Sequence, residues 1–330
     1  MRRREPRQPA KLFRLWRQKG TPVTVCIASA CNAAREVIIA TDGMSTYNEI
    51  TADVDLPKIM WFGDWTFMYS GGASSADLIF EQIRLDVTND LSVLSREKIE
   101  STVRRAFKNY LAQWSVDRNL RPYNIEMGEF LSSGRAKFGE ERFAELSRQI
   151  ENDSIKFLEQ VLVIGWGKSP HSVTMFEMNR DGMFSHSLAG IAAIGSGQNV
   201  AVSTLLSLGC GRNIPFEYTL YAVAAAKFAA ENCEGVGEKT SMFVTRKRRD
   251  GDDPSRCPCT IVPEEKIAAL REMWEKYSKP RIPDDALLKL HTISRELGYG
   301  GGMDIFAKFM EMMNKEQVKP SASEKSEPEQ

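Results

Sequence analysis

Histidine, the side chain that most often does acid–base or metal chemistry near neutral pH, is scarce in this chain. It occurs only at positions 171, 186 and 291. This scarcity weighs against a histidine-based catalytic triad and against a histidine-rich metal site. Cys257-Pro258-Cys259 could form half of a zinc site, but no second cysteine pair lies at ligand spacing. We therefore expect neither a metal nor a cofactor.

The elements that must position any catalytic group follow from the apolar pattern. The first half predicts two β-hairpins, and Gly71-Gly72 then ends the sheet before two helices. The second half predicts three strands, two helices, a further pair of strands and a final helix. The expected strands are 23–28, 37–41, 58–62, 65–69, 160–166, 172–178, 191–194, 239–246 and 259–262; the expected helices are 73–87, 95–114, 199–208, 216–232 and 264–277. This order predicts an α+β fold with two mainly antiparallel sheets in the middle and helices outside both faces.

The overall composition excludes several classes of protein. The 330 residues contain 44 Lys+Arg and 44 Asp+Glu, so the net charge is zero, and a strongly basic body that holds nucleic acid by charge is excluded. No run approaches 18 consecutive apolar residues, so we expect no membrane-spanning helix. The six cysteines are scattered over a long chain, which is typical of reduced thiols in a cytoplasmic protein.

A series of short motifs, in a fixed order, points to a known family. The motifs are Gly20-Thr21, Thr24-Val25-Cys26-Ile27-Ala28, Ile38-Ile39-Ala40-Thr41-Asp42-Gly43, Pro57-Lys58-Ile59, Ser70-Gly71-Gly72-Ala73, Leu162-Val163-Ile164-Gly165-Trp166 and Ala193-Ile194-Gly195-Ser196-Gly197-Gln198. Through these motifs the chain resembles the β-type subunits of the proteasome, and the bacterial two-ring ATP-dependent peptidase is a similar branch. The resemblance implies an N-terminal-nucleophile (Ntn) hydrolase with a four-layer αββα sandwich.

The resemblance also assigns roles to residues. An N-terminal residue supplies both a nucleophile and, through its own α-amine, the base, which explains the lack of useful histidines. Asp42 and Lys58 lie 16 positions apart, as the family's orienting acid and buried cation do. Gly71, with Gly72, falls on the oxyanion turn, and Ser196 falls on a supporting serine. At the end of the long helix the family has Asp and Ser, where this chain has Glu234 and Gly237, so Glu234 is the expected substitute carboxylate and Gly237 supplies no hydroxyl.

Three residues before Asp42 could be the nucleophile. Family spacing without a gap selects Cys26, while Gly20-Thr21 imitates a processing junction. In an antiparallel hairpin, the sequence numbers of any two residues that face each other add up to the same total. With the turn at 32–35, the residue that faces Asp42 is about 24 to 25. We therefore rank Thr24 first, Thr21 second and Cys26 third. Each is internal, so its amine requires cleavage of a leader.

The chain divides into a basic leader or arm (1–20), the Ntn body (21–278) with a helical insertion at about 115–152, a helical extension (279–315) and a disordered tail (316–330). We expect a self-processing threonine-type hydrolase that acts on peptides or small amides and assembles as a homo-oligomer. An ATPase partner is compatible with the family, but no residue points to one. The alternative is a non-catalytic homologue of the same fold that serves as an assembly or scaffold subunit.

Overall fold

The computed structural model describes residues 24–47, 50–53, 58–87, 95–156, 159–166, 173–253, 258–277 and 284–298. Within these ranges twelve strands and eight α-helices follow one another. The strands are β1 (Val25–Cys31), β2 (Glu36–Asp42), β3 (Met44–Tyr47), β4 (Ile50–Asp53), β5 (Ile59–Phe62), β6 (Trp65–Ser70), β7 (Gln160–Trp166), β8 (Val173–Asn179), β9 (Gly182–Ser185), β10 (Ile191–Gly195), β11 (Thr240–Arg246) and β12 (Cys259–Ile261). The α-helices are α1 (Ala73–Val87), α2 (Arg96–Asn119), α3 (Met127–Phe138), α4 (Glu140–Lys156), α5 (Gln198–Ser207), α6 (Phe216–Ala230), α7 (Glu264–Tyr277) and α8 (Asp284–Glu296).

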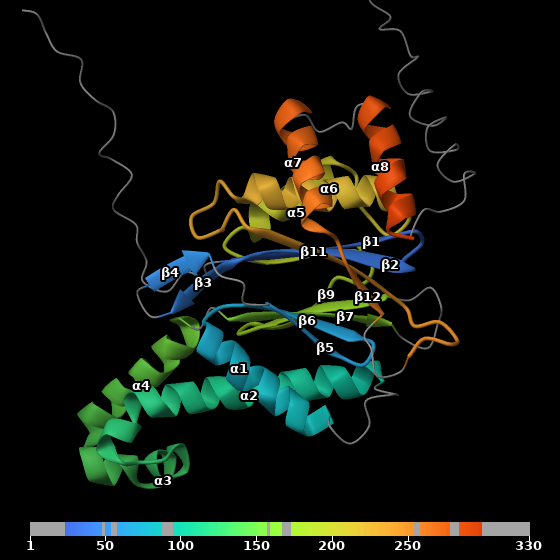
Figure 1. Cartoon of the computed structure of the whole chain (residues 1–330). Helices are drawn as coiled ribbons and strands as arrows, with labels where there is room; N and C mark the ends of the chain where they lie inside the picture. Colours follow the sequence, from blue (N-terminus) through green and yellow to red (C-terminus); the bar gives the residue numbers. More distant parts are fainter. Residues whose placement is uncertain are drawn as a thin grey trace, which may run out of the picture.

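Two five-stranded sheets form the centre of the molecule. The first has the order β10-β1-β2-β11-β12 and the second the order β5-β6-β7-β8-β9. Every strand pairing among the described residues is antiparallel. Figure 1 shows α5 and α6 covering the outer face of the first sheet, with α7 and α8 packed against α6, and α1 and α2 covering the outer face of the second sheet. The α+β class and the four-layer αββα sandwich expected from the sequence are thus confirmed.

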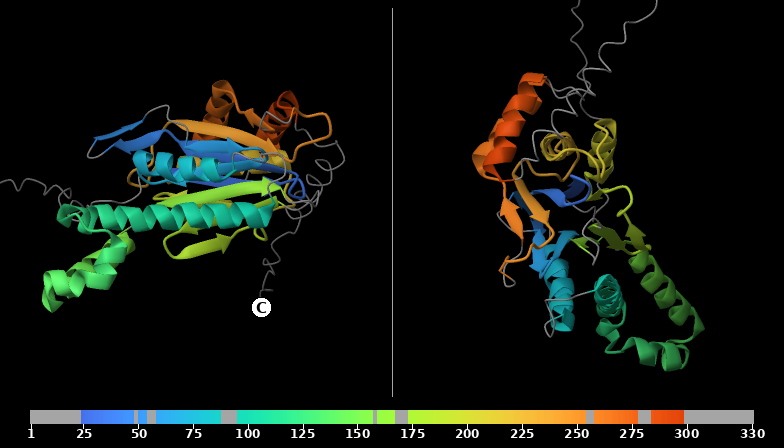
Figure 2. Two further views of the ribbon diagram at one scale, coloured as in Figure 1. Left: turned by 90° about the horizontal axis from the view of Figure 1, so that it is seen from below. Right: turned by 90° about the vertical axis from the view of Figure 1, so that its right-hand side faces the viewer.

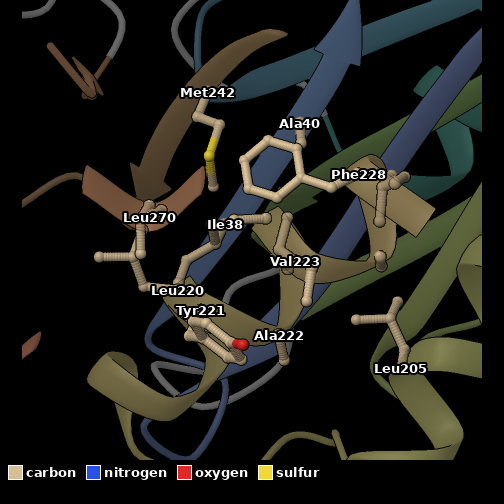
Figure 3. Packing of buried hydrophobic residues seen from close by; sticks show 14 of the residues in the cluster. Ile38, Ala40, Leu205, Leu220, Tyr221, Ala222, Val223, Phe228, Met242 and Leu270 are labelled. Atoms are coloured by element: carbon tan, nitrogen blue, oxygen red, sulfur yellow. The ribbon is translucent and has the colours of Figure 1, made fainter. Parts of the chain in front are cut away.

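Alternation along β1 divides its side chains between two layers of the core, since neighbouring residues of a strand point to opposite faces. Val25 and Ile27 pack toward the helices, whereas Cys26, Ala28 and Ala30 pack between the sheets. Figure 3 shows part of the helix-side layer, where Leu220 and Val223 of α6 lie over Ile38 of β2. The small side chains Ala222 and Ala224 of α6 are fully buried in the same layer. Both faces of β1 are therefore buried, which fixes its register.

A helical arm extends from the body beyond the ends of the sheets. It consists of the last turns of α2, a short 3-10 helix (Arg121–Tyr123), α3 and α4 (Figure 2). The arm has a hydrophobic cluster of its own, made by Val116, Leu120, Ile125, Phe130 and Leu146. This cluster is distinct from the layer that α1 and α2 form with the second sheet.

Candidate active site

The β1–β2 hairpin brings Thr24 and Asp42 to the same end of the first sheet. Its turn, at 32–35, places Asn32, Ala33 and Ala34 in the left-handed region. The backbone N–H groups of Asn32 and Ala34 donate to the carbonyls of Ile214 and Arg212, which hold the turn in this conformation. The resulting register pairs Cys26 with Thr41, so their positions sum to 67. Thr24 therefore precedes β1 directly beside the last residue of β2, in agreement with the hairpin arithmetic.

Thr24, Asp42 and Lys58 meet in a three-way contact. Thr24 Oγ1 donates to Asp42 Oδ1 at 2.5 Å, and Lys58 Nζ forms an ion pair with the same oxygen at 2.6 Å. Lys58 Nζ also donates to Thr24 Oγ1. The three side chains come from the start of β1, the end of β2 and the residue before β5, so both sheets contribute to the site.

The Asp42 carboxylate is completely buried, yet both of its oxygens accept hydrogen bonds. Val25 N donates to Oδ1 at 3.1 Å, and Gly237 N donates to Oδ2 at 2.9 Å. The Asp42 side chain is 0% exposed and that of Lys58 is 11% exposed. A buried charge is tolerated when it is paired and hydrogen-bonded in this way. The carboxylate can therefore fix the position of the Lys58 ammonium beside the Thr24 hydroxyl.

The Gly195-Ser196-Gly197 turn supports the backbone of Thr24. Thr24 N donates to Ser196 Oγ at 3.4 Å, and Ser196 Oγ donates to Thr24 O at 3.2 Å. Gly195 has φ +97°, and a Cβ at this position would lie 2.3 Å from Thr24 O. Only glycine allows this close approach, so the turn is shaped around the threonine.

Gly71 follows β6 at the same end of the sandwich. Its φ of +147° is accessible to glycine, and an added Cβ would lie 2.6 Å from the Tyr69 hydroxyl. Cys26 Sγ donates to Tyr69 O at 3.4 Å, which places the end of β6 beside the start of β1. Gly71 thus lies near the three-way contact, although no hydrogen bond joins it to Thr24.

The structure does not bring the remaining predicted residues into this contact. Glu234 is exposed, and it makes no hydrogen bond or ion pair with the three described residues of the contact. Cys26 lies between the sheets, fully buried, where burial raises the pKa of its thiol to about 12 and disfavours the thiolate. Thr21 lies outside the described residues.

Two contributors to the site were missed by sequence reasoning. Gly237 was judged only for its lack of a hydroxyl, but its backbone N–H bonds Asp42. Lys227 is a buried lysine that bonds the Gly237 carbonyl at 2.6 Å. Neither has a sequence signal of its own, because a backbone donor has no side chain to recognise and lysine is usually exposed.

The arrangement has the parts needed for hydroxyl-based nucleophilic chemistry. A cation beside the hydroxyl lowers the cost of forming an alkoxide, and a buried carboxylate holds that cation in place. In the intact chain the Thr24 nitrogen is a peptide amide and is not basic. A base for the hydroxyl proton would appear at this position only if the Val23–Thr24 peptide bond were cleaved.

Comparison with known proteins finds structures with a similar fold but no matching family. No family model matches the chain, and no curated protein matches it. Among solved structures it is similar to Anbu (ancestral beta-subunit) from Yersinia bercovieri, with 11% identity, a TM-score of 0.51, and coverage of 77% of this chain and 94% of that chain. Two structures of Anbu from Hyphomicrobium sp. strain MC1, one of them the Gly-1 mutant, give 11% identity and the same coverage, with TM-scores of 0.51 and 0.50.

These findings correct the assignment to the proteasome β-subunit family and its bacterial two-ring branch. The similar structures are ancestral-beta-subunit proteins, and an identity of 11% shows a shared fold alone. The chain shares the fold of these structures, a sandwich of two antiparallel sheets between two layers of helices. In the described part of the chain, no helix is both long and apolar enough to cross a membrane.

Proposed function

We propose that this protein is a threonine-type amide or peptide hydrolase whose nucleophile, Thr24, becomes N-terminal by self-processing. The observation that carries the proposal is the contact of Thr24 Oγ1 with both Asp42 and Lys58. A threonine that served only as a strand residue would not need a buried cation and a buried carboxylate on its hydroxyl. Burial of two charged groups costs free energy, and a catalytic role for Asp42 and Lys58 accounts for that cost.

The release of the leader uses the same hydroxyl. Thr24 Oγ1 attacks the carbonyl carbon of Val23, the C–N bond to Thr24 breaks, and the nitrogen takes up the proton as an amine. The resulting ester between Val23 and Thr24 is hydrolysed by water, which leaves a carboxylate on Val23 and restores the hydroxyl. Lys58 supports the negative charge that develops on Oγ1 during the attack.

In the processed protein the free α-amine takes the hydroxyl proton as Oγ1 attacks the substrate carbonyl. An acyl-enzyme ester forms, the leaving amine receives the proton, and water then releases the acid. Gly71 or Gly72 is the expected backbone donor to the oxyanion. Ser196, bonded to Thr24 N and O, keeps the amine near the hydroxyl.

A non-catalytic homologue of the same fold is the second candidate. It is favoured by the state of Thr24 in the intact chain, where the nitrogen is an amide bonded to Ser196 and the residue is only 1% exposed. If no cleavage occurs, the three-way contact is a buried structural network and the protein is an assembly or scaffold subunit.

Intact mass of the purified protein separates the two candidates. Loss of residues 1–23 is expected, and periodate should then oxidise the new N-terminal amino alcohol to an aldehyde, a reaction that an internal threonine does not give. Thr24→Ala should retain the leader, whereas Thr24→Ser, which keeps a hydroxyl, should still release it. A wild-type chain that stays full length would refute self-processing and favour the scaffold.

The remaining features of the proposed protein follow from its surface and its thiols. Leu78 and Leu85 on the outer face of α1 are exposed, which suits a homo-oligomer that forms through the outer helices. Light scattering that gave a single particle of monomer mass would contradict this assembly. The described cysteines are free thiols, in keeping with the cytoplasm. The expected substrate is a peptide or a small amide.

A further inference from the structure

Lys227 is a lysine with no exposed surface, near the end of α6. Its relative exposure is 0%, and its neighbours along the helix are alanine and phenylalanine. Burial of an ammonium group is costly unless every donor finds a partner. The contacts of Lys227 should therefore show what the buried charge does.

The Lys227 ammonium bonds one carboxylate and two backbone carbonyls. Nζ lies 2.5 Å from Glu231 Oε1, 2.6 Å from Gly237 O and 3.3 Å from Glu238 O. All three of its N–H donors thus have an acceptor. The two carbonyls belong to the loop between α6 and β11, so the lysine ties this loop to the helix.

Arg271 of α7 holds the same loop from its outer side. Its guanidinium forms a bidentate ion pair with Glu231, at 2.8 and 2.7 Å, and also donates to Glu238 O at 3.1 Å. Glu231 is therefore shared by two cations, and one end of the loop is fixed by both α6 and α7.

The other side of the loop holds Asp42. Gly237 N donates to Asp42 Oδ2 at 2.9 Å, and Gly43 N donates to Lys239 O at 3.2 Å. The carbonyl of Gly237 is bonded by Lys227 while its N–H is bonded by Asp42. A change in the position of Gly237 would therefore reach the carboxylate that orients Lys58.

We propose that Lys227 is a positioning residue of the hydrolase: it fixes Gly237 so that the backbone N–H of Gly237 holds Asp42, and through Asp42 the Lys58–Thr24 contact. The inference rests on the proposed function. Gly237, which lacks the hydroxyl expected at its position, contributes through its backbone, and Lys227 supplies the rigidity. Burial lowers the pKa of Lys227, with Glu231 opposing the shift, so this site tolerates the ammonium only while its acceptors stay in place.

Lys227→Met tests the inference, because methionine keeps most of the stem and removes the charge. Lys266→Met is the matched control, since Lys266 pairs with Glu296 on the surface of the same helical layer. The first measurement is amide hydrogen exchange in residues 235–240. We expect exchange there to rise about tenfold in Lys227→Met and to stay unchanged in Lys266→Met, with the rest of the sandwich still protected.

The second measurement is hydrolysis of a fluorogenic peptide amide by the processed protein. A positioning residue should lower kcat by about 10- to 100-fold and leave KM within about twofold. Unchanged exchange, or raised exchange with unchanged kcat, would overturn the inference. If Lys227→Met does not fold, Arg271→Met removes the outer half of the clamp and should loosen 235–240 and lower kcat to a smaller extent; unchanged exchange there also overturns it.

The two proposals fail in different ways. A wild-type chain that neither releases residues 1–23 nor hydrolyses the peptide refutes the proposed function. Hydrogen exchange still decides in that case whether Lys227 holds the Gly237 loop.

Discussion

Replacement of Lys58 by methionine tests the chemistry at its most specific point. The Lys58 ammonium contacts both the Thr24 hydroxyl and Asp42 Oδ1, and no other lysine or arginine of the described residues bonds Asp42. Methionine keeps most of the aliphatic stem between the sheets and removes only the cation. The variant therefore leaves a fully buried carboxylate without its ion-pair partner.

The structural cost can be estimated from what Asp42 retains. Breaking a buried ion pair costs about 3–5 kcal/mol when one charge is left uncompensated. Asp42 keeps its hydrogen bonds from Thr24 Oγ1, Val25 N and Gly237 N, so we expect the low end, about 3 kcal/mol of unfolding free energy. The effect on catalysis is also large, since loss of one preorganised electrostatic group lowers turnover by about 10²–10³-fold.

Urea unfolding measures the first quantity, and two assays measure the second. Intact mass follows release of the leader, and a fluorogenic peptide amide follows turnover after processing. Lys266→Met again serves as the control, because its surface ion pair should contribute no more than about 1 kcal/mol.

The catalytic role of Lys58 is refuted if Lys58→Met releases its leader and turns over substrate at the wild-type rate. A loss of stability with full activity would show that the cation serves the fold alone. A loss of activity with unchanged stability would instead show that the hydrogen bonds to Asp42 compensate for the missing charge.

Two further predictions concern the surroundings of the site. Burial raises the pKa of the Cys26 thiol from 9.0 to about 12, so above pH 9 the unfolded chain loses a proton that the folded chain keeps. Stability should therefore fall as pH rises from 9 toward 12, by about 1.4 kcal/mol per pH unit from this thiol, and Cys26→Ala should lower the slope measured by urea unfolding by that amount. Gly71→Ala should destabilise by about 1–3 kcal/mol through backbone strain and by a similar further amount through its clash with Tyr69. Gly182 has a similar φ of +138°, but the space around it is open, so Gly182→Ala should show the cost of backbone strain alone. Equal shifts in melting temperature for the two variants would exclude a contribution from the clash with Tyr69.

Much of the fold could be predicted because its signals are local. The β-branched runs that became β1 and β2, and Gly63-Asp64 between β5 and β6, each determine a hairpin from neighbouring residues. Hairpin arithmetic also predicted that residue 24 or 25 would lie beside Asp42, because pairing in a short hairpin depends only on where the turn is. The strands β3 and β4 were not predicted, since Met44–Tyr47 and Ile50–Asp53 are short and mix polar with apolar residues.

The parts of the site that escaped prediction depend on contacts between distant segments. Gly237 lies 195 positions from Asp42, and its contribution is a backbone N–H that any residue except proline has. Lys227 is buried only because α6 packs between the sheet and α7, which no local pattern around a lysine reveals. Glu234 was selected by counting along the chain, and the loop that follows α6 instead directs its side chain to solvent.

The helical arm has a consequence for how this protein melts. Its cluster of Val116, Leu120, Ile125, Phe130 and Leu146 is small and does not merge with the larger clusters of the sandwich. A segment with its own minor core and few links to the rest can open cooperatively while the remainder stays folded. Heating should then produce two calorimetric transitions, and a single melting temperature would describe neither unit.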